Sequence, residues 1–449
     1  MRRLAIGFTL VAIGCVPLAP PALGQASSTP AGQSSPSSQT PLRLSRREAI
    51  DEALARNPGL LATRAQVEQA RAQVVVARAI PDPTLAVDVA GQSQALNPGS
   101  GNASDLGVGL TIPFPGKIRL RGEVATTALR AAEFTLTQQR QQVASMTAQA
   151  YDAVLVALRH GDDLRQSKEL ALDFLAKTKA RFLAGTVAKV DVVKAQVDVA
   201  QAENDLLANE RALVAARASL NRLLGRTGGA PVETTDGLEM PATFRELAEL
   251  EALERLAEAS RPELKSLEIQ RQGARAATRL AKEYWVPDVN LTLTRNAVDG
   301  TPTTFTTGIG LGFPIFLRQH RQGEVAAAIH REEELAANAA DTAAQVSLDV
   351  RTSYASASTA LRQAIFLRDE LLPEAREVYR VASVSYGLGG SSALELLDAK
   401  RTLLDAEKQY VDALGAANDA RAALELAVGA PLPPSEAKPS GDKPSGDKP

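Results

Sequence analysis

The sequence predicts a mainly α-helical protein with a small β part, built from one unit that occurs twice. The strongest observation is a repeat: YGLGGSSALELLDAKRTLLD at 386–405 is similar to FLAGTVAKVDVVKAQVDVAQ at 182–201. At one constant offset, four pairs fall in register: Phe182/Tyr386, Gly185/Gly389, Asp191/Glu395 and Ala195/Ala399. A long period that occurs twice indicates a duplicated architectural unit. Very long proline-poor runs and four short segments of period two predict the helices and strands of each unit.

Composition limits the classes of protein that fit. The net charge of −2 gives no reason to expect nucleic acid or anionic lipid as a partner. Aromatic residues make up only 4% of the chain, which suits long helices better than a compact core with large fillers. The single cysteine, Cys15, excludes an internal disulfide and a cysteine-rich metal site.

Residues 1–24 are typical of a secretory signal, with Arg2 and Arg3 before an apolar tract and ALG before Gln25. An alternative interpretation uses AIGC as a lipoprotein-type site that ends at Cys15. Ordinary cleavage is favoured, because the tract before Cys15 is short and apolar sequence continues beyond it. No later stretch has the roughly 20 unbroken apolar residues of a membrane helix. We therefore expect a protein that leaves the cytoplasm and that spans a membrane, if at all, as strands.

The first repeat is expected at 42–229, after a disordered, low-complexity linker at 25–41. Ser45 and Glu48 fit a capping box, and a single helix is expected from there to Val76. Alternating apolar residues then predict two strands, at about 84–90 and 105–113. The proline-free run 117–181 predicts a helix of roughly 95 Å. After the Gly185 corner, a return helix is expected at 187–224, followed by a connection at 230–246.

The second repeat, 247–430, has the same order of elements. RPEL at Arg261 corresponds to NPGL at Asn57, and strands are expected at about 287–295 and 304–316. The second long run, 319–386, contains Pro373, which has no counterpart in the first repeat and predicts a kink or helix junction. A last helix is expected at 393–428, before a disordered tail at 431–449.

The four strands each have an apolar face and a face of Gly, Thr, Asn and Asp. The adjoining helices are too long to fold back over the apolar face, so lipid is its expected environment. A bilayer requires a closed sheet, because unpaired edge groups cannot be satisfied there. Four strands cannot close alone. Eight strands from two copies would leave an interior filled by side chains, whereas twelve from three copies leave a lumen, and the Gly-rich face favours the trimer.

These features together resemble the TolC-like outer membrane efflux proteins. The resemblance rests on the signal, the duplicated unit, the RF-x-x-G and Y-x-x-G corners and ELLDAKRTLLDA, and it extends over about 42–429. NPGL, RPEL, ELLPEA and LLDAKRTLLDAE are most similar to the heavy-metal efflux subgroup. The resemblance implies a homotrimer with a twelve-stranded β-barrel in the outer membrane and a long periplasmic α-helical barrel of coiled-coil hairpins. It also implies two partners, a periplasmic adaptor protein and an inner-membrane pump, usually of the resistance-nodulation-division class.

The resemblance also implies a periplasmic gate. Glu395 and Asp398 share one helix face, and spacing alone fits a solvated helix start; the family carries aspartates there that ring the entrance and attract cations. Tyr386 and Asp191 match a pair that holds neighbouring helix pairs together in the closed state, although Tyr386 could instead cap its corner. An arginine that makes a second such link in the type member of the family is absent here, and Ser391 stands in its place.

The two corners are the expected docking sites for the adaptor, with Phe182 and Gly185 in one and Tyr386 and Gly389 in the other. No nucleophile–base arrangement, metal-ligand set or cofactor motif stands out, so a non-enzymatic channel is expected. His160, His320 and His330 are interpreted as surface residues. A periplasmic coiled-coil adaptor or scaffold is the alternative, but it would need no lipid-facing strands. The sequence does not identify the exported substrate, which could be metal cations or small organic compounds.

Overall fold

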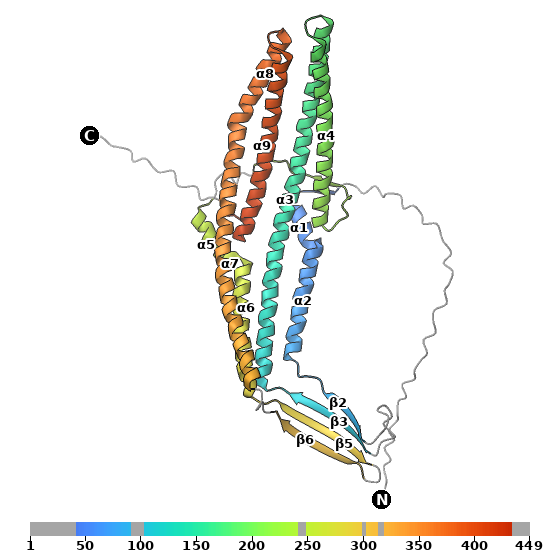
Figure 1. Cartoon of the computed structure of the whole chain (residues 1–449), viewed down its shortest axis with the longest axis vertical. Coiled ribbons are helices and arrows are strands. Elements are labelled where there is room, and N and C mark those ends of the chain that lie inside the picture. Colours follow the sequence, from blue (N-terminus) through green and yellow to red (C-terminus); the bar gives the residue numbers. More distant parts are fainter. Residues whose placement is uncertain (1–41, 91–102, 241–247, 299–301, 313–317, 433–449) are drawn as a thin grey trace, which may run out of the picture. The chain divides into compact units, whose positions relative to one another are not determined.

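The two repeats predicted from the sequence are present as two similar series of helices and strands (Figure 1). The computed structural model describes residues 42–90, 103–240, 248–298, 302–312 and 318–432. The predicted signal at 1–24 with Cys15, the linker at 25–41 and residues 433–449 of the tail lie outside the described residues. The first repeat consists of α1 (Arg46–Arg56), α2 (Pro58–Arg78), β2 (Thr84–Ala90), β3 (Ala103–Ile112), α3 (Pro115–Leu183) and α4 (Lys189–Leu223). The second consists of α5 (Leu250–Ser260), α6 (Pro262–Lys282), β5 (Val289–Val298), β6 (Thr304–Leu311), α7 (Arg318–Phe366), α8 (Leu372–Leu388) and α9 (Ala393–Val428).

The first helix of each repeat is broken into two, so the prediction of one helix from Ser45 to Val76 is wrong. The capping box of Ser45 and Glu48 is confirmed, but α1 ends at Asn57. Pro58 disfavours helical angles at Asn57, yet it fits the first turn of α2, where no N–H is needed. The Asn57 side chain bridges the break: its Oδ1 accepts the Leu60 N–H at 3.2 Å and its Nδ2 donates to the Leu223 carbonyl at 2.9 Å. Pro262 separates α5 from α6 in the same way.

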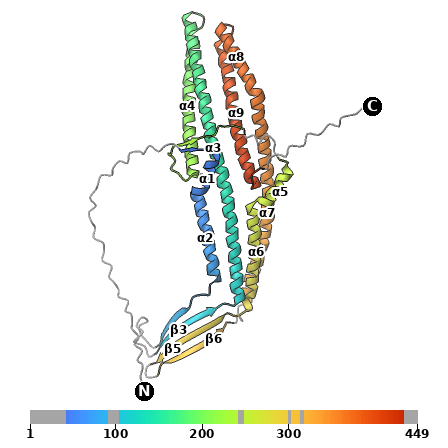
Figure 2. The same ribbon diagram turned by 180° about the vertical axis from the view of Figure 1, so that it is seen from behind.

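The long helices differ between the repeats. Helix α3 is continuous over 69 residues, and α2 and α4 pack along it one after the other (Figure 2). In the second repeat, a π-helical segment, η3 (Leu367–Leu371), separates α7 from α8, and Pro373 lies in the first turn of α8. The helix junction expected at Pro373 is therefore confirmed. A π turn followed by proline is a common physical cause of a local bend.

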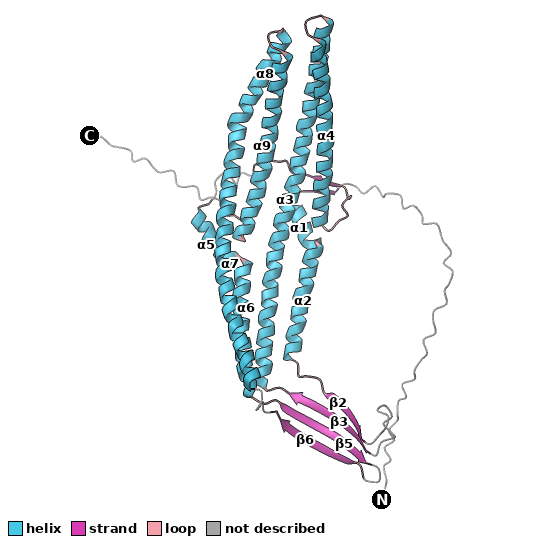
Figure 3. Ribbon diagram, in the orientation of Figure 1, coloured by secondary structure: helices cyan, strands magenta, loops and turns pink. Residues whose placement is uncertain are grey.

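The four predicted strands form one antiparallel sheet in the order β2-β3-β5-β6 (Figure 3). Val108 lies between Leu85 and Leu293 in the register, so apolar residues of neighbouring strands share one face. Most of that face is exposed in the single chain, including Leu85 at 69% and Ile309 at 78%. Within the described residues, β2 and β6 are open edges of the sheet. Residues 313–317, which include the end of the strand predicted at 304–316, are outside the description.

A second, two-stranded sheet was not predicted. Strand β1 (Leu42–Leu44) pairs in parallel with β4 (Val232–Thr234), inside what the sequence indicated was a plain connection at 230–246. The sheet covers Tyr151 of α3, whose buried hydroxyl lies 2.9 Å from the Leu44 carbonyl. Three-residue strands carry too little alternation to be recognised in a sequence, so tertiary packing decides their existence.

Small residues allow the helices around α3 to approach closely. A Cβ on Gly273 of α6 would lie 2.4 Å from the Thr127 Oγ1 of α3. On the other side of α3, a Cβ on Gly122 would lie 2.9 Å from the Arg78 side chain of α2. None of the helices in the described ranges is both long and apolar enough to cross a membrane. The helices thus form a closely packed layer, with the four-stranded sheet at one end and the two corners at the other (Figures 1 and 2).

Candidate gate at the two helical corners

Both helical hairpins turn through the same type of glycine corner. Gly185, between α3 and α4, has φ of 72°, and Gly389, between α8 and α9, has φ of 84°. The N–H of Thr186 donates to the Arg181 carbonyl at 3.0 Å, and the N–H of Gly390 donates to the Ser385 carbonyl at 2.8 Å. These are Schellman-type caps, in which a left-handed residue ends the helix. The two glycine corners predicted from the sequence are therefore present, and both glycines have left-handed backbone angles.

The aromatic residues before the two glycines have different surroundings. Tyr386 is 1% exposed and packs against Phe174 of α3, with 5.5 Å between the ring centroids. Phe182, its counterpart in the first repeat, is 41% exposed. The two repeats therefore place the same type of side chain in a core at one corner and at the surface at the other.

Tyr386 joins the α8–α9 hairpin to α3 through two residues of that helix. The hydroxyl of Thr178 donates to the Phe174 carbonyl at 2.8 Å, so the Tyr386 hydroxyl donates to the Thr178 Oγ1 at 2.9 Å. The Arg181 guanidinium carbon lies 4.6 Å from the centroid of the Tyr386 ring, and its Nη1 donates to the Tyr386 carbonyl at 2.8 Å. Such a cation–π contact on a buried ring stabilises the packing further.

The predicted contact of Tyr386 with Asp191 is absent within the described chain, where the Tyr386 hydroxyl bonds to Thr178 instead. Asp191 lies in the first turn of α4, and its side chain is 3.9 Å from Lys194. Sequence reasoning missed Thr178 and Arg181. Arg181 belongs to the RF-x-x-G corner and could have been noticed there, whereas a mid-helix threonine gives no signal.

A second link between the hairpins is a largely buried ion pair. The Nζ of Lys400 in α9 lies 2.7 Å from the Asp198 Oδ2 of α4, and the Lys400 side chain is only 5% exposed. Lysine is rarely buried without a partner, so this pair fixes α9 against α4 near the corners. Sequence spacing alone could not have paired these two residues.

Glu395 and Asp398 are both exposed at the start of α9. Glu395 forms a capping box with Ser392, whose Oγ accepts the Glu395 N–H at 3.2 Å. Glu395 therefore lies at a helix start, as its spacing in the sequence alone would indicate. The Oγ of Ser391, the residue found in place of the expected arginine, lies 3.3 Å from the Ala382 carbonyl. The single chain does not bring Glu395 and Asp398 into contact with each other.

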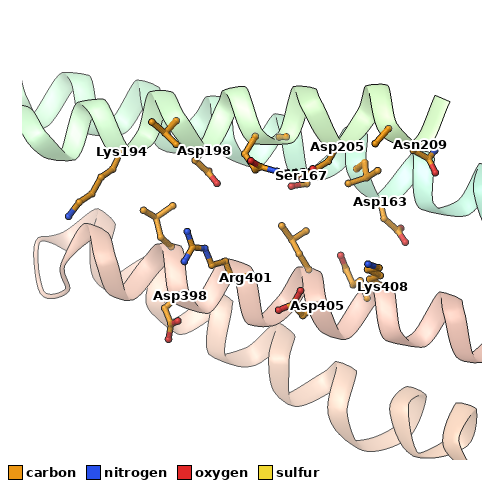
Figure 4. A pocket seen from close by; sticks show the side chains of 18 of the residues that line it. Asp163, Ser167, Lys194, Asp198, Asp205, Asn209, Asp398, Arg401, Asp405 and Lys408 are labelled. Carbon is orange, nitrogen blue, oxygen red and sulfur yellow. Dashed lines mark hydrogen bonds between the residues drawn. The ribbon is translucent and has the colours of Figure 1, made fainter. Parts of the chain in front are cut away.

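A groove of about 860 Å³ runs between α4 and α9, over α3 (Figure 4). Valines of α4 and leucines of α9 line it together with charged residues of both helices. Figure 4 shows Asp198 and Arg401 pointing into the groove from opposite sides. Asp398 belongs to the lining, whereas Glu395 does not. The groove therefore extends along both hairpins past the Lys400–Asp198 ion pair, whose aspartate is part of its lining.

His160, interpreted from the sequence as a surface residue, is half-buried, and the side chain of His320 lies outside the described residues. The Nε2 of His160 lies 2.8 Å from the Asp412 Oδ1 of α9, and its side chain is only 19% exposed. His330 is exposed and pairs with Glu333, three residues along α7. Among the described residues, no group of three or more His, Cys, Asp or Glu side chains is arranged to hold a metal ion.

A duplicated pair of helical hairpins, with a four-stranded sheet at one end and glycine corners at the other, defines the class of TolC-like outer membrane channels. The chain belongs to the family described as "Outer membrane efflux protein", which it matches over residues 49–226 and 253–430. It is 25% identical to the cobalt-zinc-cadmium resistance protein CzcC of Cupriavidus metallidurans, over 85% of this chain and 89% of that protein. It is also 25% identical to the outer membrane protein OprJ of Pseudomonas aeruginosa, over 82% of this chain and 80% of that one.

Solved structures show the same fold. The chain superposes on CusC with a TM-score of 0.70 at 20% identity, covering 86% of this chain and 92% of that one. For a membrane protein from Pseudomonas aeruginosa the TM-score is 0.72 at 23% identity, with 86% and 92% covered. The predicted resemblance and the outer membrane location are thus confirmed. The family consists of efflux channels rather than enzymes, and membership in it replaces the alternative of a periplasmic scaffold.

Proposed function

We propose that the chain is the outer membrane channel of a tripartite efflux system that exports metal cations. The observation that carries this proposal is the match to the cobalt-zinc-cadmium resistance protein CzcC over 85% of the chain. The NPGL, RPEL and LLDAKRTLLDAE motifs support the same subgroup. The match to OprJ keeps small toxic organic compounds as a second substrate class.

The proposed assembly is a homotrimer whose sheets close into a twelve-stranded barrel. Two features support it: the apolar sheet face is exposed in the single chain, and β2 and β6 have free edges that a neighbouring copy could pair. Unpaired edges are not tolerated in a bilayer, so pairing between copies is required. The partners would be a periplasmic adaptor, docked at the Gly185 and Gly389 corners, and an inner-membrane pump of the resistance-nodulation-division class.

In the proposed gate, packing and charge have separate roles. Tyr386, with Thr178 and Arg181, holds the α8–α9 hairpin against α3. A link from Tyr386 to Asp191 would then have to form in another state or between copies. Glu395 and Asp398 of three copies would form a ring of carboxylates that favours cations over anions.

The test is complementation of a strain that lacks the gene. Loss of the gene should raise sensitivity to cobalt, zinc or cadmium ions, because their export would lose its outer membrane route, and the wild-type chain should restore growth. A Glu395→Ala/Asp398→Ala variant should insert normally but show lower cation preference in planar-bilayer recordings. Normal metal tolerance with raised sensitivity to organic toxicants would instead favour the second substrate class. Unchanged tolerance of both would contradict the efflux role.

A further inference from the structure

The contact between α3 and α9 is a row of polar contacts, whose residue numbers rise along one helix and fall along the other. His160 pairs with Asp412, and further from the corners the Ser145 Oγ lies 3.2 Å from the Ala422 carbonyl. Beyond that, the Gln141 Nε2 donates to the Gly429 carbonyl at 2.8 Å. This row is the seam along which the α3–α4 hairpin meets α9 of the other hairpin.

Ionisable side chains of α3 and α9 face the same cavities along this seam, and Asp152, Asp163 and Glu407 are the least exposed of them, whereas Asp419 is exposed. Asp163 of α3 and Glu407 of α9 line the same groove, and their side chains are only 15% and 13% exposed. Further along, Asp152 and Asp419 line a second cavity, of about 510 Å³, between α3, α4 and α9. His160 and Asp412 line it too, so acid–acid pairs lie on both sides of the His160–Asp412 pair.

A close backbone approach lies between the His160–Asp412 pair and the Asp152–Asp419 pair. A Cβ on Gly415 of α9 would lie 2.7 Å from the Cγ2 of Val156 in α3. The two helices are therefore in tight contact at this level, and repulsion between carboxylates that face each other from α3 and α9 opposes that contact. A change of charge on these acids consequently acts on the helix packing itself.

We propose that the α3–α9 seam, from Asp163/Glu407 to Asp152/Asp419, is a proton-sensitive joint between the two hairpins, which tightens when its carboxylates are protonated. Its consequence for opening of the channel rests on the proposed function.

At both acid pairs, the pKa of each carboxyl group is raised above its ordinary value. Burial raises the pKa of Asp163 against the opposing effect of Arg159, and burial together with the charge of Asp163 raises the pKa of Glu407. Burial likewise raises the pKa of Asp152 against its ion pair with Arg46, and burial and the charge of Asp152 raise the pKa of Asp419 to about 6. The other charged groups that face the four acids are His160, Asp162, Asp236, Arg376, Arg421 and Lys408.

The direction of the pH effect follows from linkage. A carboxyl group whose pKa is raised in the packed seam binds its proton more tightly there than when the helices separate, so protons favour the packed state. For Asp419 this contribution is complete below the ordinary value of 3.8 and is lost as the pH rises through about 6.

The test measures the distance across the cavity directly, in the full-length chain in detergent. Nitroxide labels on Ala212→Cys of α4 and Ala416→Cys of α9, both exposed residues of the cavity lining, report the separation by double electron–electron resonance in a Cys15→Ser background. From about pH 5 to about pH 8 the shortest distance should grow by about 1–2 Å, a typical helix shift. In the Asp163→Asn/Glu407→Gln variant, which carries neutral isosteres, the growth should shrink to less than about half.

The matched control is Asp173→Asn, because Asp173 is an exposed acid of α3 that pairs with Lys177 on its own helix. It should keep the full wild-type pH dependence. The proposal of a proton-sensitive joint would be contradicted if the wild-type distance were the same at both pH values. It would also be contradicted if the neutral double variant showed the full wild-type shift. The distance measurement does not depend on transport. Failure of the metal-tolerance test would therefore not contradict the joint, and failure of the distance test would not contradict the efflux function.

Discussion

The two hairpins are related in sequence but differ in the continuity of their long helices and in how their corners are anchored. The α3–α4 hairpin contains a continuous 69-residue helix, and its corner side chain, Phe182, is 41% exposed. The α8–α9 hairpin follows a π-helical break at Leu367–Leu371, and its corner side chain, Tyr386, is 1% exposed. A hairpin that can bend needs specific contacts to fix its position, whereas a continuous helix in the middle of the layer does not. The comparison therefore contrasts one hairpin with an unbroken helix and a second hairpin that has a break and is held at its corner by Tyr386.

The largest expected effect is the contrast between Tyr386→Ala and Phe182→Ala. Removing the buried ring should lower the free energy of unfolding by about 3–5 kcal/mol, because a cavity forms beside Phe174. Removing the exposed ring of Phe182 should lower the free energy of unfolding by about 1 kcal/mol or less. Chemical unfolding followed by helical circular dichroism would measure both. Equal losses would mean that the two corners are anchored alike.

A second large effect is expected at the buried ion pair. Asp198→Ala leaves the Lys400 ammonium buried without a partner and should cost about 3 kcal/mol. The control is Asp173→Ala, which removes an exposed pair with Lys177 and should cost about 0–1 kcal/mol. The same unfolding assay applies. A loss at Asp198 no greater than at Asp173 would show that the pair does not hold α9 to α4.

The two corner glycines should respond alike. Gly185→Ala and Gly389→Ala should each cost about 1–2 kcal/mol, because an L-residue is strained in the left-handed region. Space is available at both: no atom lies within 4 Å of a Cβ on Gly185, and the nearest to Gly389 is the Arg181 Nη2 at 3.8 Å. If the corners dock the adaptor, efflux should fall while membrane insertion and trimer yield stay normal. Unchanged resistance in both variants would count against docking there.

The smallest expected effect is that of Pro373→Ala on stability. The change restores a backbone N–H in the first turn of α8, so the free energy of unfolding should change by less than about 1 kcal/mol. Amide hydrogen exchange over Leu367–Leu371 should become slower, because the π segment gains a donor that can complete its helical bonds. Faster exchange, or no change, would mean that the break does not depend on the proline.

The sequence by itself determined the helices, the four long strands and the corners. Long proline-free runs leave the helix as the only regular structure, and strict period two identifies a strand with two different faces. Gly185 and Gly389 were recognisable because a left-handed helix end strongly favours glycine. Pro373 likewise predicted the helix junction, because proline lacks the N–H that a continuous helix uses.

Only the tertiary structure decided which side chains meet. The break at Asn57 is stabilised by a bond to Leu223, and the β1–β4 sheet joins segments far apart in the chain. The Tyr386 hydroxyl bonds to Thr178 rather than to Asp191, and His160 lies against Asp412. Periodicity fixes the face of a helix on which a residue lies, but not the axial offset at which another helix packs. That offset is set by close approaches such as Gly415 on Val156, which no local pattern encodes.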